Sequence, residues 1–261
     1  MGVKYLGNGN INGVPIHDMT AVEFDALGAE LTRVALASGF YTLIDDSKVE
    51  RWRGRLDKPS VNRVLVVTPT LRLEPATVQS IFALEWDGPI DYYFTKDNPY
   101  TGVLQYKNIE RNMNKARRVL LDGGYDAMFI VESDMIAPSD ALYKLSLADA
   151  DVAGGLYLMR NRPMVTNVII HRPNDWLDRS YMQLTEVGIH PELIRTNGVS
   201  CGCALIKAHV LKDISFRHVL PHSPDWEFMA DCNKQGFYTA CDRTVKCGHI
   251  QEDGKVLMPD Y

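Results

Sequence analysis

Short apolar runs that alternate with helical patterns constrain the fold of this chain more than any other feature. Residues 64–67 (Val-Leu-Val-Val) and 127–131 (Ala-Met-Phe-Ile-Val) contain no polar side chain, and each leads into a polar turn. A strand that is buried on both faces of a parallel sheet has this composition. Residues 107–122 lie between the two runs and form an amphipathic helical pattern. The alternation predicts an α/β fold with a mixed, mostly parallel sheet flanked by helices.

Shorter elements are predicted on both sides of these runs. Strands are expected at residues 90–95, 151–158, 164–170, 199–206 and 237–241, and helices at residues 74–86 and 225–235. In open α/β sheets, ligands bind beyond the carboxyl ends of the parallel strands. Residues 68–70, 96–97 and 132–134 follow three predicted strands, so we expect them to meet at one edge of the sheet.

Three segments of different character follow one another along the chain. Residues 1–45 predict a small helical appendage, in which Thr20 and Glu23 have the spacing of a capping box. Residues 46–62 predict a basic linker, because the stretch from 48 to 63 holds six basic residues and two acidic ones. Residues 63–261 are expected to form the main domain, since 261 residues suit one large domain with an appendage.

Composition and charge exclude several classes of protein. Hydrophobic residues make up 46% and charged residues 23% of the chain, which excludes a disordered chain, a collagen-like chain and a coiled coil. The formal net charge of −5 argues against a protein that coats nucleic acid non-specifically. No apolar run approaches the roughly 20 residues that span a bilayer, and no apolar signal core follows Met1. We therefore expect a cytoplasmic protein without membrane insertion.

Two carboxylates directly after the second apolar run are the sharpest chemical feature. Glu132 and Asp134 stand one residue apart, and positions i and i+2 of an extended chain point the same way. Two oxygen ligands on one side suit a hard divalent cation such as Mg²⁺ or Mn²⁺, which could bridge substrate phosphates. A solvated turn would have the same residue types, so the pair alone is a weak signal.

The polar face of the helix predicted at residues 107–122 is a second candidate feature. Four polar side chains are spaced so that they lie opposite its apolar stripe: Asn108, Arg111, Asn112 and Lys115. Few acidic residues accompany them, so this face suits an anion. A solvated helix face has the same pattern, and both interpretations remain open.

Two places late in the chain offer further candidate groups. Asp225 and Glu227 open a predicted helix, where positions i and i+2 diverge by about 200°, so only one can face a cleft. A carboxylate at the mouth of a cleft can serve as a general base. His249 follows a late strand, and a neutral imidazole can join carboxylates on a metal, although a lone His is more often structural.

The order of these motifs resembles that of the nucleotide-sugar-dependent glycosyltransferases of the A-type fold, in particular the inverting family-2-like group and its phage relatives. The resemblance runs over about residues 64–250. It implies the A-type fold and a metal-dependent, hexosyltransferase-like enzyme that uses Mn²⁺ or Mg²⁺. Such an enzyme moves a sugar from a nucleoside-diphosphate sugar to an acceptor hydroxyl with inversion.

The first residues carry a second resemblance. The motif Gly13-Val14-Pro15, followed by Asp18 and Thr20 and later by Ala-Ser-Gly-Phe-Tyr, is similar to a short N-terminal module of bacteriophage and prophage proteins. This resemblance implies a phage or prophage origin and no particular activity. It covers about 40 residues.

The glycosyltransferase resemblance implies a role for each matching residue. Asp134 would bind the metal, Glu132 would touch the metal or the ribose, and His249 would complete the metal site. Asp225 would be the catalytic base. The nucleotide would contact Thr68, Pro69, Thr70, Asp97, Arg111, Asn112, Lys115 and Ser133, and the acceptor or sugar would contact Trp226, Gly202 and Tyr157.

The chain departs from the pattern of the family at two positions. Glu132 stands where the family has a shorter carboxylate, which would hold a metal more loosely. Pro224 stands before Asp225 where the family has an acidic residue, so Glu227 remains an alternative base.

Two other functions remain open. One is a phage glycosyltransferase that acts on hydroxymethylated DNA bases, with modified DNA instead of a glycan as acceptor; the phage-like N-terminus and the basic linker favour it. The other is a non-catalytic sugar-binding or virion-associated module. The placement of Glu132, Asp134, Asp225 and His249 discriminates: clustering around one cleft favours an enzyme, and a separation larger than a metal site excludes one.

Overall fold

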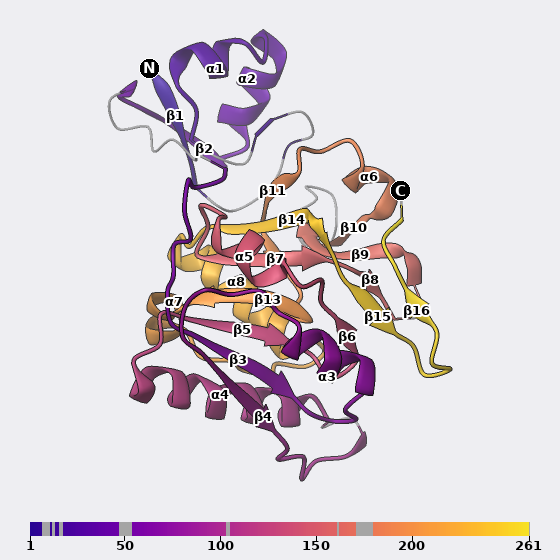
Figure 1. The fold of residues 1–261 in the computed structure, drawn as a ribbon. Coiled ribbons are helices and arrows are strands. Elements are labelled where there is room, and N and C mark those ends of the chain that lie inside the picture. Colours follow the sequence, from indigo (N-terminus) through magenta and orange to yellow (C-terminus); the bar gives the residue numbers. More distant parts are fainter. Residues whose placement is uncertain are drawn as a thin grey trace.

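A seven-stranded mixed sheet forms the centre of the computed structural model, which describes residues 1–6, 11, 14–15, 18–46, 54–102, 105–160, 162–170 and 180–260 (Figure 1). The strand order is β11-β14-β7-β13-β5-β3-β4. In that order the strands are Leu193–Thr196, Thr239–Lys246, Val152–Leu156, Cys203–Lys207, Ala127–Val131, Val64–Pro69 and Ile90–Thr95. Only β13 and β11 run against the other strands of this sheet. The expected α/β fold, with a mixed, mostly parallel sheet flanked by helices, is confirmed.

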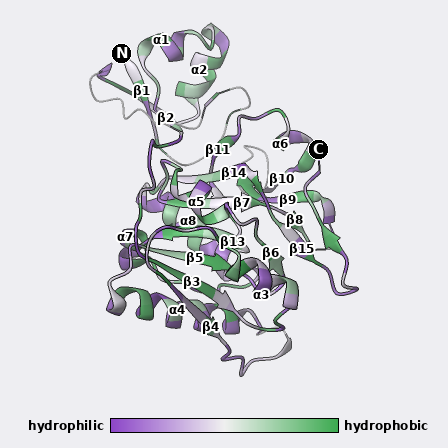
Figure 2. Ribbon diagram, in the orientation of Figure 1, coloured by the Kyte–Doolittle hydropathy of each residue, from purple (hydrophilic) through white to green (hydrophobic). Residues whose placement is uncertain are grey.

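Helices cover both faces of this sheet because its central strands are apolar on both sides. Along β3, Leu65 and Val67 join one core with α4, α7 and α8, whereas Val64 and Val66 join a second core with α3 and α5. These helices are α3 (Pro75–Phe82), α4 (Tyr106–Gly123), α5 (Ala141–Ser146), α7 (Ala208–Asp213) and α8 (Pro224–Gln235). Figure 2 shows hydrophobic central strands beside an α4 that alternates between hydrophobic and hydrophilic residues.

Two smaller sheets extend the domain beyond the carboxyl ends of the strands. In one of them β9 (Arg162–Ile170) pairs with β8 (Leu158–Met159), β10 (Ser180–Gln183) and β12 (Gly198–Val199), and β10 leads into the short helix α6 (Leu184–Val187). In the other, β15 (Gly248–Ile250) lies between β6 (Met135–Ile136) and β16 (Val256–Leu257). The register pairs His249 with Met135, which places His249 beside the turn that holds Asp134.

Several predicted boundaries differ from the structure. The strand expected at 199–206 is divided into β12 and β13, because the chain turns at residues 201–202. The strand expected at 237–241 continues to Lys246, and the helix expected at 74–86 ends at Phe82. No helix in the described ranges has both the length and the apolar character that a membrane span requires.

The N-terminal residues form a small unit with its own core. It contains the antiparallel strands β1 (Gly2–Tyr5) and β2 (Tyr41–Ile44) besides the helices α1 (Ala21–Asp25) and α2 (Ala29–Ala37). The capping box of Thr20 and Glu23 is present. The single expected helix is broken at Gly28, whose φ of 85° no helix residue adopts. The strands were not predicted, since each has only four residues.

The end of the basic linker is attached to the main domain. Arg55 Nη1 lies 2.7 Å from Oδ2 of Asp242, whose side chain is fully buried. A second carboxylate, that of Glu192, lies 3.9 Å from Arg55 Nη2. Arg51 and Arg53 lie outside the described residues. Arg55 therefore forms an ion pair within the protein and does not contribute to an open basic surface.

Candidate active site

The parallel strands β4, β3 and β5 end at one edge of the sheet, as the sequence predicts. Pro69 lies opposite Thr95 in the register, and Thr70 N–H donates to the Thr95 carbonyl at 2.8 Å. The side chains of Thr68 and Thr95 are buried, and neither hydroxyl has a hydrogen-bond partner among the described residues. Buried polar groups are usually paired. Two unpaired hydroxyls at this edge are therefore groups that a polar ligand could satisfy.

The loop after β4 is fastened to α4 by an asparagine. Asn112 Oδ1 accepts from Asp97 N–H at 3.0 Å, and its Nδ2 donates to Asn98 Oδ1 at 2.9 Å. Asn98 in turn donates to the Thr70 carbonyl at 2.8 Å. Asn108 holds the next part of the loop in the same way, through the N–H and the carbonyl of Tyr100. The side chains of Asn108 and Asn112 are buried. The polar face that the sequence predicts for this helix therefore consists of two buried asparagines and, beside them, the partly exposed Arg111 and Lys115.

The cations of that face surround one carboxylate. Arg111 Nε lies 2.5 Å from Asp97 Oδ2, and Lys115 binds the same oxygen. The hydrogen bond from Lys115, and then that from Arg111, hold the pKa of Asp97 below its usual value. Asp97 thus connects the loop after β4 with two basic side chains of α4.

Glu132 lies in a tight turn directly after β5. Its N–H donates to the Gly202 carbonyl at 2.9 Å, and its carbonyl accepts from Met135 N–H at 3.0 Å. Burial, followed by the charges of Asp134 and Asp225, raises the pKa of Glu132 to about 8. Burial thus favours the protonated form of the Glu132 carboxyl, which can donate a hydrogen bond. The carboxylate of Asp225 belongs to the same electrostatic cluster.

Asp134 and His249 form the best-defined pair of possible metal ligands. His249 Nδ1 lies 2.7 Å from the Leu158 carbonyl and donates to it, so in the neutral ring the lone pair is on Nε2. Nε2 lies 3.6 Å from Asp134 Oδ2. Burial acts to lower the pKa of His249, but Asp134 and the Leu158 carbonyl outweigh it and the pKa is raised. For Asp134, burial is outweighed by His249 and Arg160, and the pKa is lowered.

Arg160 is the residue of this site that the sequence did not indicate. Its guanidinium binds the Asp134 carboxylate, and Nη1 lies 3.8 Å from Glu252 Oε1. Arg160 follows the two-residue strand β8, where no motif or periodicity distinguishes it from other turn residues. The pairing depends on a contact across 26 positions of the chain.

The donor set fits a divalent cation only in part. In the described part of the chain, no group of three or more His, Cys, Asp and Glu side chains is placed to hold a metal ion. The expected set is thus reduced to Asp134 and His249, and Glu132 is not gathered as a third ligand. Mg²⁺ is commonly bound by one or two carboxylates and fills its other positions with water and substrate phosphates. The pair fits a cation that binds together with a phosphate-bearing ligand.

The two acidic residues at the start of α8 diverge, as helical geometry predicts. Glu227 is buried, with Oε1 at 2.7 Å from His222 Nδ1 and Oε2 at 2.8 Å from Arg217 Nη2. Asp225 Oδ1 accepts from Trp226 N–H at 2.9 Å and from the Ser223 hydroxyl. Both oxygens of Glu227 therefore belong to an internal ion-pair network. Asp225 is instead the carboxylate whose charge contributes to the raised pKa of Glu132.

The residues expected at the acceptor side lie in two environments. Tyr157 is buried, its hydroxyl accepts from Gly202 N–H at 3.0 Å, and its ring stands edge-on to His249 with centroids 5.7 Å apart. Trp226 is only half-buried and stands edge-on to Tyr181, with centroids 5.2 Å apart. Gly202 thus holds the Tyr157 hydroxyl, and the buried Tyr157 ring packs against His249.

Ser133 and Pro69 flank the same edge. The Ser133 carbonyl accepts from Glu74 N–H at 3.0 Å and from the Thr77 hydroxyl at 3.2 Å, which attaches the start of α3 to the turn after β5. Pro69 is the last residue of β3. The contacts of Ser133 and Pro69 with a nucleotide remain predictions.

Comparisons with known proteins give no family for this chain. No protein-family model and no curated protein sequence matches it. One similar solved structure is that of A197 from STIV, which is 16% identical with a TM-score of 0.46 and covers 76% of this chain and 95% of that chain. Another is S. aureus TarS 1-349 in complex with UDP-GlcNAc, which is 14% identical with a TM-score of 0.37 and covers 70% of this chain. The match spans 59% of that TarS chain. At these identities and scores, neither similarity establishes an activity.

Proposed function

We propose that this chain is a glycosyltransferase that moves a sugar from a nucleoside-diphosphate sugar to an acceptor hydroxyl with inversion. The observation that carries the proposal is the pair of Asp134 and His249, with Nε2 3.6 Å from Oδ2. Beside it lies Glu132, whose pKa is raised by burial and by the charges of Asp134 and Asp225. A carboxylate–imidazole pair for a cation and a separate carboxylate for a proton are the groups that this reaction needs.

The donor nucleotide is proposed to lie over the ends of β3 and β4. The unpaired hydroxyls of Thr68 and Thr95 support this position, together with the fixed loop that carries Asp97. Asn112 then acts through the loop and not by direct contact, because both ends of its amide are already bonded. Arg111 and Lys115 act mainly through Asp97.

The diphosphate and a divalent cation are proposed to meet at Asp134 and His249. When bound, Mn²⁺ or Mg²⁺ would supply charge neutralisation for the leaving nucleoside diphosphate. His249 is already oriented for this role by the Leu158 carbonyl. Arg160 must move from the Asp134 carboxylate when the cation binds, and it can then bind a phosphate oxygen.

Asp225 is the proposed catalytic base. It takes the proton of the acceptor hydroxyl while that oxygen attacks the anomeric carbon from the face opposite the diphosphate. The bond from the anomeric carbon to the diphosphate oxygen breaks, and the nucleoside diphosphate leaves with the electron pair. Burial favours the protonated form of Glu132, and in that form it can donate a hydrogen bond to the sugar nucleotide. Glu227 is a weaker candidate because Arg217 and His222 bind both of its oxygens.

Turnover of a panel of nucleotide sugars, with Mn²⁺ or with a chelator, tests the proposal. We expect one of them to be hydrolysed slowly or transferred, and Asp225→Asn to reduce turnover by about a hundredfold or more without loss of nucleotide binding. Asp87→Asn, at an exposed position of the loop before β4, is the matched control and should leave turnover unchanged. Binding without any turnover would contradict an enzyme and favour a sugar-binding module. Unchanged turnover in Asp225→Asn would overturn the assignment of the base.

A further inference from the structure

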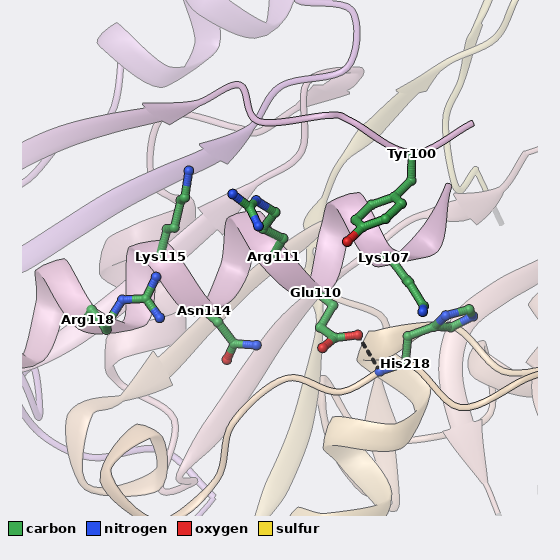
Figure 3. Close-up of a pocket in the computed structure, with 8 residues that line it drawn as sticks. All are labelled: Tyr100, Lys107, Glu110, Arg111, Asn114, Lys115, Arg118 and His218. Carbon is green, nitrogen blue, oxygen red and sulfur yellow. Dashed lines mark hydrogen bonds between the residues drawn. The ribbon is translucent and has the colours of Figure 1, made fainter. Parts of the chain in front are cut away.

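A second candidate binding site lies along α4. A cavity of about 510 Å³ is lined by four basic side chains of this helix: Lys107, Arg111, Lys115 and Arg118. Figure 3 shows them along the helix, with Tyr100 and His218 beside the end that carries Lys107. Asp134 and His249 are not among the lining residues. We call this cavity the α4 groove.

The α4 groove has an excess of positive charge that the protein does not neutralise. Asp97 pairs with Arg111 and Lys115, whereas Lys107 and Arg118 form no ion pair within the part of the chain that the structure describes. Glu110 is the one carboxylate among the lining residues. Its Oε2 accepts from His218 N–H at 3.0 Å, which fixes Glu110 at the wall.

One of the residues that line the α4 groove, His218, has an unpaired ring nitrogen. His218 Nε2 is buried and has no hydrogen-bond partner among the described residues. Buried polar atoms without a partner are rare, and a bound ion or water is one of the explanations for such an atom. The His218 ring lies 5.7 Å from the Tyr106 ring, between centroids, so an aromatic pair stands at the same end of the groove.

The length of the basic row indicates the kind of ligand. Lys107 and Arg118 are eleven positions apart, which is about 16 Å along a helix axis. One phosphate group cannot bind both, so the matching ligand carries several anionic groups in a row. Tyr100 and Tyr106 are 37% and 38% exposed and offer aromatic faces near Lys107. A basic groove with exposed aromatic rings is the arrangement that binds single-stranded nucleic acid, through phosphates and stacked bases.

We propose that the α4 groove binds a single strand of nucleic acid, with Lys107 and Arg118 on its phosphates and the Tyr100 and Tyr106 rings against its bases. The overall charge of −5 does not oppose this, because the groove concentrates basic residues on one helix. The proposal does not depend on the glycosyltransferase activity, and its test uses no nucleotide sugar.

Fluorescence anisotropy with a labelled 15-nucleotide oligo(dT), between 50 and 200 mM salt, tests this site. We expect Lys107→Ala/Arg118→Ala to weaken binding at least about tenfold at low salt. The slope of log affinity against log salt should decrease by about 1.4, which corresponds to two lost phosphate contacts. The control Lys234→Ala/Lys255→Ala removes two exposed basic residues elsewhere and should leave both values unchanged.

Inorganic polyphosphate of similar charge is the second probe. We expect it to bind more weakly than the oligonucleotide, and Tyr100→Ala to weaken only the oligonucleotide, because polyphosphate has no bases to stack. Equal binding of both probes, unaffected by Tyr100→Ala, would overturn the nucleic-acid assignment in favour of a general polyanion site. No binding of oligo(dT) at 50 mM salt, or equal losses in the variant and the control, would overturn the site.

Discussion

At the scale of the residue, the Asp134 carboxylate lies beside two basic side chains, Arg160 and His249. Arg160 binds it directly, and His249 Nε2 lies 3.6 Å away with its ring held by the Leu158 carbonyl. The sequence indicated Asp134 because it follows an apolar strand, and His249 because it follows a strand late in the chain. It could not indicate Arg160, since that contact exists only once β8 and the turn after β5 are folded together.

Removing Arg160 should make Asp134 more available to a cation. Arg160→Ala should strengthen Mn²⁺ binding several-fold in the absence of nucleotide, because a partly exposed ion pair at this carboxylate is worth about 1 kcal/mol or less. Isothermal titration with MnCl₂ measures this. Weaker or unchanged Mn²⁺ binding in Arg160→Ala would contradict competition at Asp134.

Gly202 is required by the position of Tyr157. A Cβ at Gly202 would lie 2.6 Å from the Tyr157 hydroxyl, closer than atoms can approach, and the ring is buried. Gly202→Ala should therefore lower the free energy of unfolding by about 1–3 kcal/mol. Urea denaturation followed by tryptophan fluorescence measures the change, and an unaltered midpoint would show that Tyr157 can move freely.

At the scale of the element, α4 holds two different segments of the chain through two nearby asparagines. Asn112 fastens the loop after β4, while Asn114 bonds both the N–H and the carbonyl of Phe216, before α8. The amphipathic period predicted the helix and its apolar stripe correctly. The division of its polar face was not predictable, because it depends on where the 97–100 loop lies after folding.

The two asparagines allow a matched comparison. Asn112→Ala and Asn114→Ala each remove two side-chain hydrogen bonds, so each should destabilise the fold by about 1–3 kcal/mol. Only Asn112→Ala should also weaken nucleoside diphosphate binding, several-fold, because only Asn112 holds the loop beside Thr70. Calorimetry on both variants measures this. Equal nucleotide affinities would contradict the position proposed for the nucleotide.

At the scale of the whole molecule, the sequence predicted the layers better than the connections between them. The runs at 64–67 and 127–131 were recognisable because burial on both faces demands apolar side chains throughout. Strands of two or three residues, such as β6 and β15, have no such pattern, yet their pairing brings His249 to Asp134. The linker also has a structural role that its composition concealed, since Arg55 neutralises the buried Asp242.

Loss of this linker contact should affect the whole domain. Arg55→Ala would leave the Asp242 carboxylate buried without its ion pair, although Thr244 still donates to Oδ1. We expect the free energy of unfolding to fall by about 2 kcal/mol, because a buried carboxylate loses its ion pair. The loss is smaller than for a fully buried pair, since Arg55 itself is partly exposed. Arg33→Ala, on the N-terminal helix α2, is the control. Equal thermal unfolding of Arg55→Ala and the unaltered protein would show that the linker end is not structural.

The central claim is that Asp134 and His249 bind a divalent cation together with the donor diphosphate. Electron paramagnetic resonance of Mn²⁺, titrated with the protein in the presence and absence of nucleoside diphosphates, tests it most directly. We predict weak Mn²⁺ binding to the protein alone, binding at least tenfold tighter with a matching nucleoside diphosphate, and loss of this gain in His249→Ala and in Asp134→Ala. A Mn²⁺ affinity that no nucleotide improves, or a gain that survives both substitutions, would contradict the account.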